Sequence, residues 1–249
     1  MNRLMRGLVE AVAETFALPG PILEVGSYQV AGQEGVADLR GLFPGRDYVG
    51  VDVRPGPGVD LVADVERLPH ADASVGTVLA LSTLEHVPRF WRGLDEIHRV
   101  LRPDGALLVC CPFYFHLHEH PRDFWRFSPD ALKLLLEPYP SKVLGWHGPL
   151  KRPANVWALA FREGRPAITA AEHLRYRAAM ARHAHMPLPW RRWLRYMVGR
   201  FLCGGGPFAP YLERERWQSQ LLNRRPARRR AAPPARVAAE AVVVVPAKG

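Results

Sequence analysis

Acidic and small residues end a series of short apolar runs, at the positions where a parallel sheet would present side chains to a ligand. These runs span 22–25, 48–53, 59–63 and 75–81. We expect one binding site here, because the carboxyl ends of parallel strands meet at a single edge of a sheet. The residues expected to line it are Glu24, Gly26, Ser27, Asp52, Val53, Asp64, Val65, Leu81 and Ser82.

Each residue type in this series suits one part of a nucleoside-containing ligand. The carboxylate of Glu24 suits a cationic amine, and Gly26 lets the backbone approach the ligand closely. Asp52 follows Glu24 by 28 residues, and its two oxygens can accept hydrogen bonds from both hydroxyls of a ribose. Asp64 and the backbone amide of Val65 can read an adenine edge. A single glycine at the first turn disfavours a dinucleotide oxidoreductase, which requires a G-x-G-x-x-G loop.

Residues 113–127, directly after the fifth apolar run, combine aromatic, histidine and charged side chains. Such a segment can supply both a stacking wall for an acceptor and a base for its proton. We take His118 as the first candidate base and His86, after the fourth run, as the second. Asp123 is the third catalytic candidate, either in a substrate clamp or in an ion pair that anchors the segment. The residues expected to bind the substrate are Tyr114, His116, His120, Trp125 and Arg126.

His116, His118 and His120 alternate along this segment. If the segment is extended, they share one face and could bind a divalent metal. No set of carboxylates accompanies them in the sequence, and loop histidines beside a substrate pocket account for the same spacing. The sequence therefore predicts no metal site.

Seven apolar runs alternate with helical patterns along the first part of the chain. The remaining runs span 106–111, 142–146 and 156–161, and most of the seven lack polar alternation, as strands covered on both faces do. Helical spacing predicts helices over 3–17, 33–43, 89–101 and 129–137. This order predicts an α/β fold: a doubly wound, Rossmann-like, seven-stranded and mostly parallel sheet with helices on both faces.

The pattern changes after about residue 165. Residues 169–184 and 190–202 show helical patterns separated by Pro187 and Pro189, and the last residues are rich in Arg, Ala and Pro. Such a composition is typical of disorder. We expect a ligand-binding domain over 1–165, a helical, basic C-terminal extension over 166–222 and a disordered tail over 223–249.

The second helical pattern of the extension has an apolar stripe flanked by arginines. Amphipathic helices most often cover a core, so we expect the stripe to pack on the domain or on a second subunit, as in a homodimer. Contact of residues 187–204 with an anionic membrane surface is the alternative. The stripe consists of Trp190, Trp193, Leu194, Met197, Val198, Phe201 and Leu202.

Charge and cysteine usage restrict the remaining classes of function. Residues 1–150 hold 14 Lys and Arg against 19 Asp and Glu, a net charge of −5, and residues 151–249 hold the other 20 against 5, a net charge of +15. The Arg-rich segment 224–230 has no aromatic residue for base stacking, so the nucleic-acid signal is not firm. Cys110 and Cys111 adjoin in a predicted strand and fit the reduced thiols of a cytoplasmic protein. The N-terminal segment lacks the continuous apolar run of a signal peptide.

The segments ILEVGS, YVGVDV, DLVADVERLP, LALSTLEHV and EIHRVLRPDGALLVCCP resemble, in this order, the motifs of class I S-adenosylmethionine-dependent methyltransferases of the small-molecule, type 11-like group. The resemblance covers roughly residues 20–162 and implies S-adenosylmethionine as the cofactor. It places Glu24 and Gly26 at the methionine moiety, with Leu81 and Ser82 closing over that end. By the same resemblance, Asp52 holds the ribose, and Asp64 and Val65 hold the adenine. The chain departs from the family in its single-glycine first loop, and residues 54–58 are too few for the usual helix.

Residues 118–127 carry a second, narrower resemblance. They are similar to the H-x-x-P-x-D-Y-W-R-F insert of methyltransferases associated with glycan and secondary-metabolite pathways, with Phe124 in place of Tyr. Together the two resemblances imply an enzyme of natural-product biosynthesis that methylates an O or N atom of a small acceptor, such as a sugar or a natural-product scaffold. The alternatives are an RNA or ribonucleoprotein methyltransferase anchored by the basic tail, a methyltransferase for a lipid-linked acceptor at a membrane surface, and a non-catalytic binding scaffold.

Overall fold

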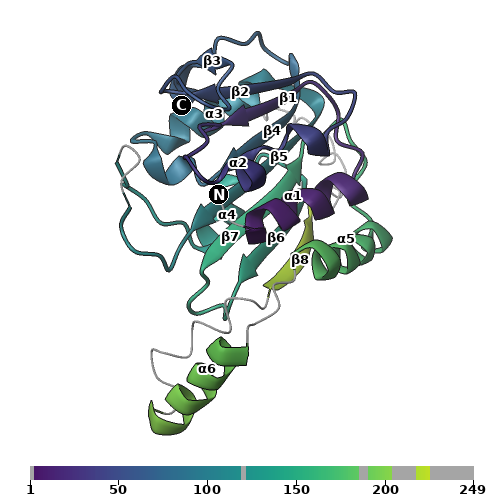
Figure 1. The fold of residues 1–249 in the computed structure, drawn as a ribbon. Helices are drawn as coiled ribbons and strands as arrows, with labels where there is room; N and C mark the ends of the chain where they lie inside the picture. The colour runs from purple at the N-terminus through teal and green to yellow at the C-terminus, as the bar shows by residue number, and fades with distance from the viewer. Residues whose placement is uncertain (1–2, 119–121, 185–189, 204–216, 225–249) are drawn as a thin grey trace, which may run out of the picture.

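The computed structural model describes residues 3–118, 122–184, 190–203 and 217–224. In this part of the chain one mixed sheet has the strand order β3-β2-β1-β4-β5-β7-β6-β8 (Figure 1). The pairs from β3 to β5 are parallel, whereas β7 runs antiparallel between β5 and β6, and β8 runs antiparallel along β6. The strands are β1 (Ile22–Val25), β2 (Tyr48–Asp52), β3 (Leu61–Val62), β4 (Val75–Leu81), β5 (Leu101–Pro112), β6 (Ser141–His147), β7 (Asn155–Phe161) and β8 (Trp217–Asn223).

The predicted α/β fold with a mostly parallel sheet is confirmed, but the predicted number of strands is wrong. All seven predicted strands are present, and β8 adds an eighth from a segment assigned to the helical extension. β8 pairs with β6 from Ser141↔Asn223 to His147↔Trp217. Its side chains alternate between exposed and half-buried, as expected for the outermost strand of a sheet. Residues 166–222 therefore contribute a strand to the sheet, and the extension is only partly helical.

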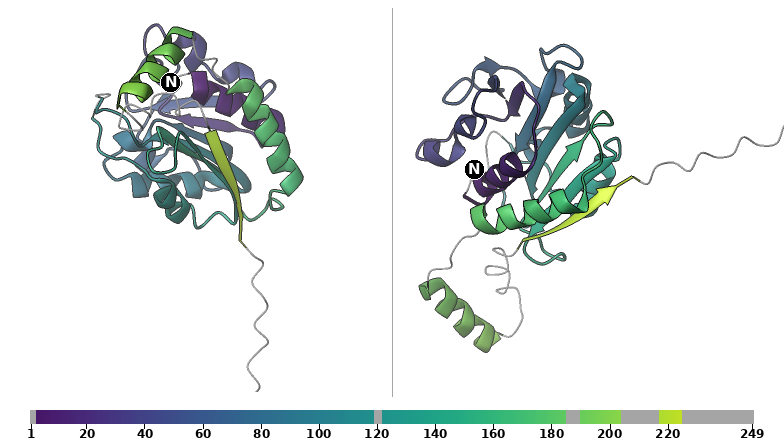
Figure 2. Two further views of the ribbon diagram at one scale, coloured as in Figure 1. Left: turned by 90° about the horizontal axis from the view of Figure 1, so that it is seen from below. Right: turned by 90° about the vertical axis from the view of Figure 1, so that its right-hand side faces the viewer.

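Helices cover both faces of the sheet, as predicted. α1 (Arg3–Thr15) and α5 (Ala170–His183) pack on one face, and α3 (Phe90–Val100) and α4 (Pro129–Leu135) pack on the other (Figures 1 and 2). Alternate residues of β4 belong to the two layers: Val78 and Ala80 pack with α3, and Leu79 packs with α1. Because both faces are buried, the strands have the near-continuous apolar composition seen in the sequence.

Local capping fixes where two of these helices begin. The hydroxyl of Ser128 accepts from the backbone N–H of Ala131 at the start of α4, as the sequence predicts. At α5, Thr169 accepts from the N–H of Glu172 while the Glu172 carboxylate accepts from the N–H of Thr169, which forms a capping box.

The helix predicted over 33–43 is wrong in its extent. It is broken into α2 (Glu34–Ala37) and a 3₁₀ turn, η1 (Arg40–Leu42), with Asp38 extended between them. The guanidinium of Arg6 in α1 donates to the carbonyl of Asp38 at 2.6 Å, and the Asp38 carboxylate accepts from the N–H of Arg40. These contacts use groups that a continuous helix would pair within itself.

The amphipathic helix of the extension, α6 (Trp190–Cys203), lies apart from the sheet (Figures 1 and 2). The expected packing of its apolar stripe on the domain is not observed, because its side chains are exposed, from 42% for Met197 to 89% for Phe201. No helix in the described ranges is long and apolar enough to span a bilayer.

Candidate functional site

A cavity of about 780 Å³ opens at the carboxyl ends of β1, β2 and β4. It has two connected walls, one formed by the strand ends and one formed by η3 (Leu84–His86) and the segment after β5. This size falls within the range of ordinary small-molecule sites. The structure brings together all the residues that the sequence predicts for the first wall. They are Glu24, Gly26, Ser27, Asp52, Val53, Asp64, Val65, Leu81 and Ser82.

Glu24 is buried in this wall, with its side chain held from the neighbouring strand. The hydroxyl of Tyr48 on β2 donates to Oε2 of Glu24 at 2.6 Å. Burial raises the pKa of Glu24 to about 7, although the Tyr48 hydrogen bond and the charge of Arg40 act in the opposite direction. Glu24 therefore titrates near neutral pH, and a bound cation would favour its charged form.

Gly26 adopts a positive φ of 78° at the end of β1. A Cβ atom at this position would overlap Oγ1 of Thr83 and lie 2.8 Å from its Cγ2. Thr83 is in turn fixed by a 2.8 Å hydrogen bond from its hydroxyl to the carbonyl of Val25. Both the backbone conformation and the close approach of Thr83 therefore require glycine. The buried hydroxyl of Ser27, next in the chain, has no partner at hydrogen-bonding geometry among the described residues.

Asp52 ends β2, is buried and lines the cavity. Its Oδ1 accepts from the backbone N–H of Arg54 at 3.0 Å and lies 3.3 Å from Nε of the same arginine. The guanidinium of Arg54 lies over the ring of Tyr28, 4.3 Å from its centroid. Asp52 is therefore held in place by the loop that follows it, while the half-exposed Val53 borders the opening.

Two further strand ends complete this wall. Oδ1 of Asp64 accepts from the N–H of Glu66 at 2.9 Å and caps the turn η2 (Val65–Arg67), which leaves Oδ2 for other partners. Ser82, after β4, adopts a positive φ of 53°. This conformation is uncommon for a residue with a side chain and concentrates at functional sites. The Ser82 hydroxyl lies 3.6 Å from Sδ of Met5, so helix α1 also closes the cavity.

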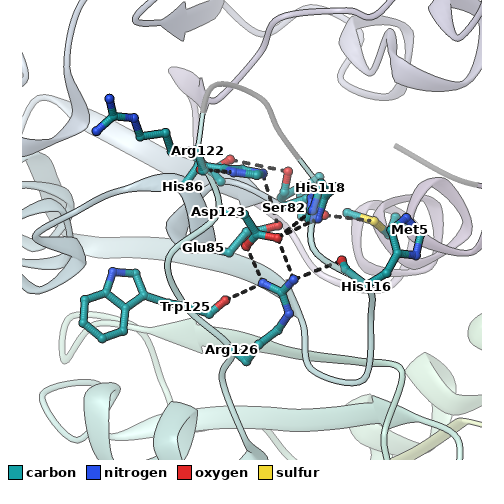
Figure 3. Close-up of polar contacts among 12 residues, drawn as sticks. Met5, Ser82, Glu85, His86, His116, His118, Arg122, Asp123, Trp125 and Arg126 are labelled. Atoms are coloured by element: carbon teal, nitrogen blue, oxygen red, sulfur yellow. Dashed lines mark hydrogen bonds and ion pairs between the residues drawn. The ribbon is translucent and has the colours of Figure 1, made fainter.

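The second wall contains His86, His116 and His118 (Figure 3). The side chains of Phe115 and Phe124 also line it. The rings of His86 and His118 meet edge to face with centroids 4.8 Å apart. Nδ1 of His86 lies 2.7 Å from the carbonyl oxygen of Arg122, which can only accept. Nδ1 therefore carries the proton, and in the neutral ring Nε2 carries the lone pair.

Asp123 and Arg126 anchor this segment. The guanidinium binds both carboxylate oxygens and also donates to the carbonyls of Trp125 and His116 (Figure 3). Oδ2 of Asp123 accepts from the backbone N–H of His118 and lies 3.0 Å from Nδ1 of its ring. The Arg126 hydrogen bonds hold the pKa of Asp123 far below its usual range. Of the two roles expected for Asp123, the geometry favours the structural ion pair, which also orients His118.

Three residues expected to bind the substrate do not line the cavity. The indole N–H of Trp125 donates to the carbonyl of Val87 at 3.0 Å, and its ring packs against Phe90. Arg126 forms the ion pair with Asp123, and Tyr114, shortly after the end of β5, is exposed. His120 lies outside the described residues.

Several lining residues were missed from the sequence. Leu4 and Met5 come from the N-terminal helix, whose amphipathic pattern indicated only that it packs on a core. Thr83 belongs to the recognised motif, but its contact with Gly26 becomes visible only in three dimensions. Glu85, beside the cavity, is fully buried, and neither carboxylate oxygen has a hydrogen-bond partner in the described part of the chain. Burial raises its pKa to about 8.

Residues 34–109 match a family model described as a methyltransferase domain. The matched segment runs from α2 into β5 and includes Asp52, Asp64, Ser82 and His86. The fold is that of a class I methyltransferase. Among solved structures, this methyltransferase fold is similar to that of 1,6-didemethyltoxoflavin-N1-methyltransferase from Burkholderia thailandensis, which was solved with 1,6-didemethyltoxoflavin and S-adenosylhomocysteine bound. The two are 18% identical with a TM-score of 0.50, over 64% of this chain and 78% of that one.

Two curated methyltransferases are similar to this chain over short segments. The 27-O-demethylrifamycin SV methyltransferase of Amycolatopsis mediterranei (strain S699) is 45% identical over 47 residues, which are 19% of this chain and 17% of that protein. The phthiotriol/phenolphthiotriol dimycocerosates methyltransferase 1 of Mycobacterium ulcerans (strain Agy99) is 47% identical over 53 residues, which are 21% of this chain and 20% of that protein. The matches thus span about a fifth of the curated relatives' length.

Proposed function

We propose that this chain is an S-adenosylmethionine-dependent methyltransferase that acts on an O or N atom of a small acceptor. The observation that carries the proposal is the single cavity in which the strand-end wall, with Glu24, Asp52 and Asp64, continues into the histidine wall, with His86 and His118. One wall suits a charged nucleoside cofactor, and the other suits an acceptor whose proton must be removed. Methyl transfer requires these two ligands to lie side by side.

The residues of the first wall fit S-adenosylmethionine, which supplies an electrophilic methyl group on a sulfonium. Glu24 is placed to bind the amino group of the methionine moiety, and Gly26 leaves the backbone free to approach it. The carboxylate of Asp52, held by the loop after β2, is placed to accept from the ribose hydroxyls. The unused oxygen of Asp64 and the amide of Val65 are placed for the adenine.

The second wall positions the acceptor and handles its proton. Nε2 is the acceptor nitrogen of a neutral His86 ring, because Nδ1 donates to the Arg122 carbonyl. His118 is oriented by Asp123. Either imidazole can take a proton from a hydroxyl or ammonium acceptor, and Phe115, His116 and Phe124 offer rings for stacking. The free, buried thiols of Cys110 and Cys111 fit a reducing compartment such as the cytoplasm.

We assign the acceptor to the class of natural-product or sugar-like scaffolds. The names of the two curated relatives refer to a rifamycin and to phthiotriol dimycocerosates, and the aromatic and histidine residues of the second wall suit a ring-bearing, hydroxylated molecule. The competing RNA acceptor would need the Arg-rich segment, which lies outside the described residues except for Arg224.

Calorimetry with S-adenosylmethionine tests the cofactor half. We expect the intact protein to bind one equivalent and Asp52→Ala to bind at least about 10-fold more weakly, because each ribose hydrogen bond to a carboxylate contributes about 1.5–3 kcal/mol. Asp72→Ala is the matched control, because Asp72 is an exposed aspartate paired with Arg99, outside the cavity lining. No binding by the intact protein would overturn the proposal.

Deletion of 225–249 tests the class of acceptor. The deletion should preserve turnover of a small acceptor, and it should abolish activity only if the acceptor is RNA.

The exposed stripe of α6 favours one additional role, contact with an anionic membrane that presents a lipid-linked acceptor. Trp190 and Trp193 lie on the stripe, and the exposed Arg191 and Arg195 flank it, so the helix combines apolar anchors with positive charge. Flotation with vesicles containing anionic lipid should recover the full chain but not a chain lacking 187–204, and neutral vesicles should recover neither. Equal recovery of both chains would eliminate this role, and a dimer that dissociates on deletion of 187–204 would assign the stripe to a second subunit.

A further inference from the structure

Three potential metal ligands converge at the second wall of the cavity. Glu85 and His86 lie on the turn η3, and His118 lies on the segment after β5 (Figure 3). One ligand atom from each residue lies within 4.8 Å of the other two. Donor atoms that share a metal at about 2.0–2.2 Å are separated by up to about 4 Å, so only a small contraction is needed.

The tautomer of His86 places the lone pair of its neutral ring on Nε2, the nitrogen that lies near Glu85. Its Nδ1–H donates a hydrogen bond to the carbonyl oxygen of Arg122 at 2.7 Å, and its Nε2 lies 3.9 Å from Oε1 of Glu85. This separation is too long for a direct hydrogen bond. It suits two ligand atoms on either side of one cation.

Glu85 supplies an independent observation. Its side chain is fully buried, and neither oxygen has a partner at hydrogen-bonding geometry among the described residues. An unpaired carboxylate in such a place is costly. A divalent cation would compensate the charge of the Glu85 carboxylate, with His86 close enough to supply a second ligand atom.

His118 has the support expected of a metal ligand. Oδ2 of Asp123 lies 3.0 Å from Nδ1 of the ring and is itself fixed by Arg126. This approach lacks hydrogen-bonding geometry in the described residues, so Asp123 contributes a negative charge beside the ring and does not fix its tautomer. Carboxylates are common neighbours of ligating imidazoles. The backbone carbonyl of Glu85 accepts from the N–H groups of Phe124 and Trp125, which fastens the two ligand-bearing segments together.

We propose that Glu85, His86 and His118 bind one divalent transition-metal ion at the acceptor end of the cavity. Two imidazoles and one carboxylate favour zinc, cobalt, manganese or iron over magnesium or calcium. The set differs from the alternating trio in the sequence, because only His118 of that trio takes part. Three protein ligands leave coordination positions open toward the cavity, as in catalytic rather than structural sites.

The site has a direct use if the methyltransferase function proposed above is correct, and this use rests on that proposal. A bound divalent ion lowers the pKa of a coordinated hydroxyl. The acceptor hydroxyl bound to the ion would then release its proton to water, and its oxygen would accept the methyl group without either imidazole serving as the base.

Cobalt titration of the full chain, free of affinity tags and dialysed against a chelator, tests the site. We expect visible d–d absorption that saturates at one equivalent of Co²⁺. His86→Ala and His118→Ala should each weaken binding by at least about 10–100-fold, the loss already typical of an outer-shell change. Glu85→Gln should do the same while preserving shape. His116→Ala is the matched control, since this neighbouring histidine lines the cavity but is not in the set, and it should bind cobalt as the wild type does.

The melting temperature of each variant without metal shows whether it is folded. Co²⁺ should raise the melting temperature of the wild type and of His116→Ala, but not the melting temperatures of the three ligand variants. Absent d–d absorption, or equal affinity in the wild type and His118→Ala, overturns the site. An equal loss in His116→Ala also overturns it, in favour of the alternating histidines. Calorimetry with S-adenosylmethionine on the same metal-free protein separates the two proposals. Cofactor binding without cobalt binding removes only the metal site, and the reverse removes only the methyltransferase function.

Discussion

The hydroxyl of Tyr48 on β2 donates a 2.6 Å hydrogen bond to Oε2 of Glu24 on the neighbouring strand β1. Glu24 is almost completely buried, and the nearby charges are those of Arg40, which lowers its pKa, and Asp38, which raises it. Burial prevails and moves the pKa from 4.5 to about 7. A carboxyl group with this pKa changes charge within the pH range of ordinary experiments.

Stability of the protein should therefore decrease as the pH rises through this range. Folding raises the pKa of Glu24, so between pH 4.5 and 7 the folded state holds a proton that the unfolded state has lost. The stabilisation from this group is complete below pH 4.5 and disappears above pH 7, with a total of roughly 3 kcal/mol by linkage. Urea unfolding at pH 4.5 and 8 should show a smaller loss in Glu24→Gln than in the wild type. The exposed Glu137→Gln should change as the wild type does, and an unchanged loss in Glu24→Gln would refute the assignment.

Removal of the Tyr48 hydroxyl should weaken cofactor binding more at pH 7 than at pH 9. Without this donor the pKa of Glu24 rises further. At pH 7 more of the carboxyl groups are then protonated, and their ionisation on cofactor binding opposes the binding free energy. We expect Tyr48→Phe to bind S-adenosylmethionine about 10-fold more weakly at pH 7, since a hydrogen bond to a charged group contributes about 1.5–3 kcal/mol. Calorimetry at both pH values measures this. Tyr139→Phe removes another buried hydroxyl, which lacks a partner among the described residues, and should leave the affinity unchanged at either pH.

Alanine at Gly26 should reduce both stability and cofactor affinity. The left-handed backbone costs about 1–2 kcal/mol for a residue with a Cβ atom, and the overlap with Thr83 adds about 1–3 kcal/mol of overpacking. Gly32→Ala is a matched control, because Gly32 has a φ of 81° but open space around its Cβ position. Denaturant unfolding should show a loss at least twice as large for Gly26→Ala as for Gly32→Ala. Equal losses would mean that Thr83 moves aside freely.

The sequence predicted the strand-end wall but not the cluster around Glu85, and the reason is physical. Asp52 and Asp64 follow apolar runs directly, and parallel strands bring such ends together whatever the loops do. Glu85 is a charged residue within a turn, where exposure is the ordinary expectation. It is buried because the segment after β5 folds over it, and that segment begins about thirty residues later. The helix break at Asp38 and the strand β8 likewise depend on distant partners, Arg6 and β6.

Replacement of Arg126 by lysine should impair the acceptor side more than the cofactor side. Lysine keeps the charge but cannot bind both oxygens of Asp123 and the carbonyls of Trp125 and His116 at once. With an acceptor substrate, we expect kcat/KM to fall by about 10–100-fold, because small displacements of the groups that position a substrate typically cause losses of this size. The affinity for S-adenosylmethionine should change less than 2-fold. Arg102→Lys disturbs a surface pair with Asp104 and should change neither quantity. An equal loss of cofactor affinity in Arg126→Lys would contradict the division between the two walls.

The close packing of α1 against α5 should affect cofactor binding, because it positions the residues of α1 that line the cavity. At Gly7 a Cβ atom would overlap the carbonyl oxygen of His183 and lie 2.8 Å from Cα of Ala184. Because these are backbone atoms, Gly7→Ala must push the two helices apart and displace the start of α1, which supplies Leu4 and Met5 to the cavity. We expect a loss of about 1–3 kcal/mol in the free energy of unfolding and a weaker affinity for the cofactor. Gly199→Ala on α6, where the Cβ position is open, should cause neither change. Normal cofactor affinity in a destabilised Gly7→Ala would show that the position of α1 does not affect the site.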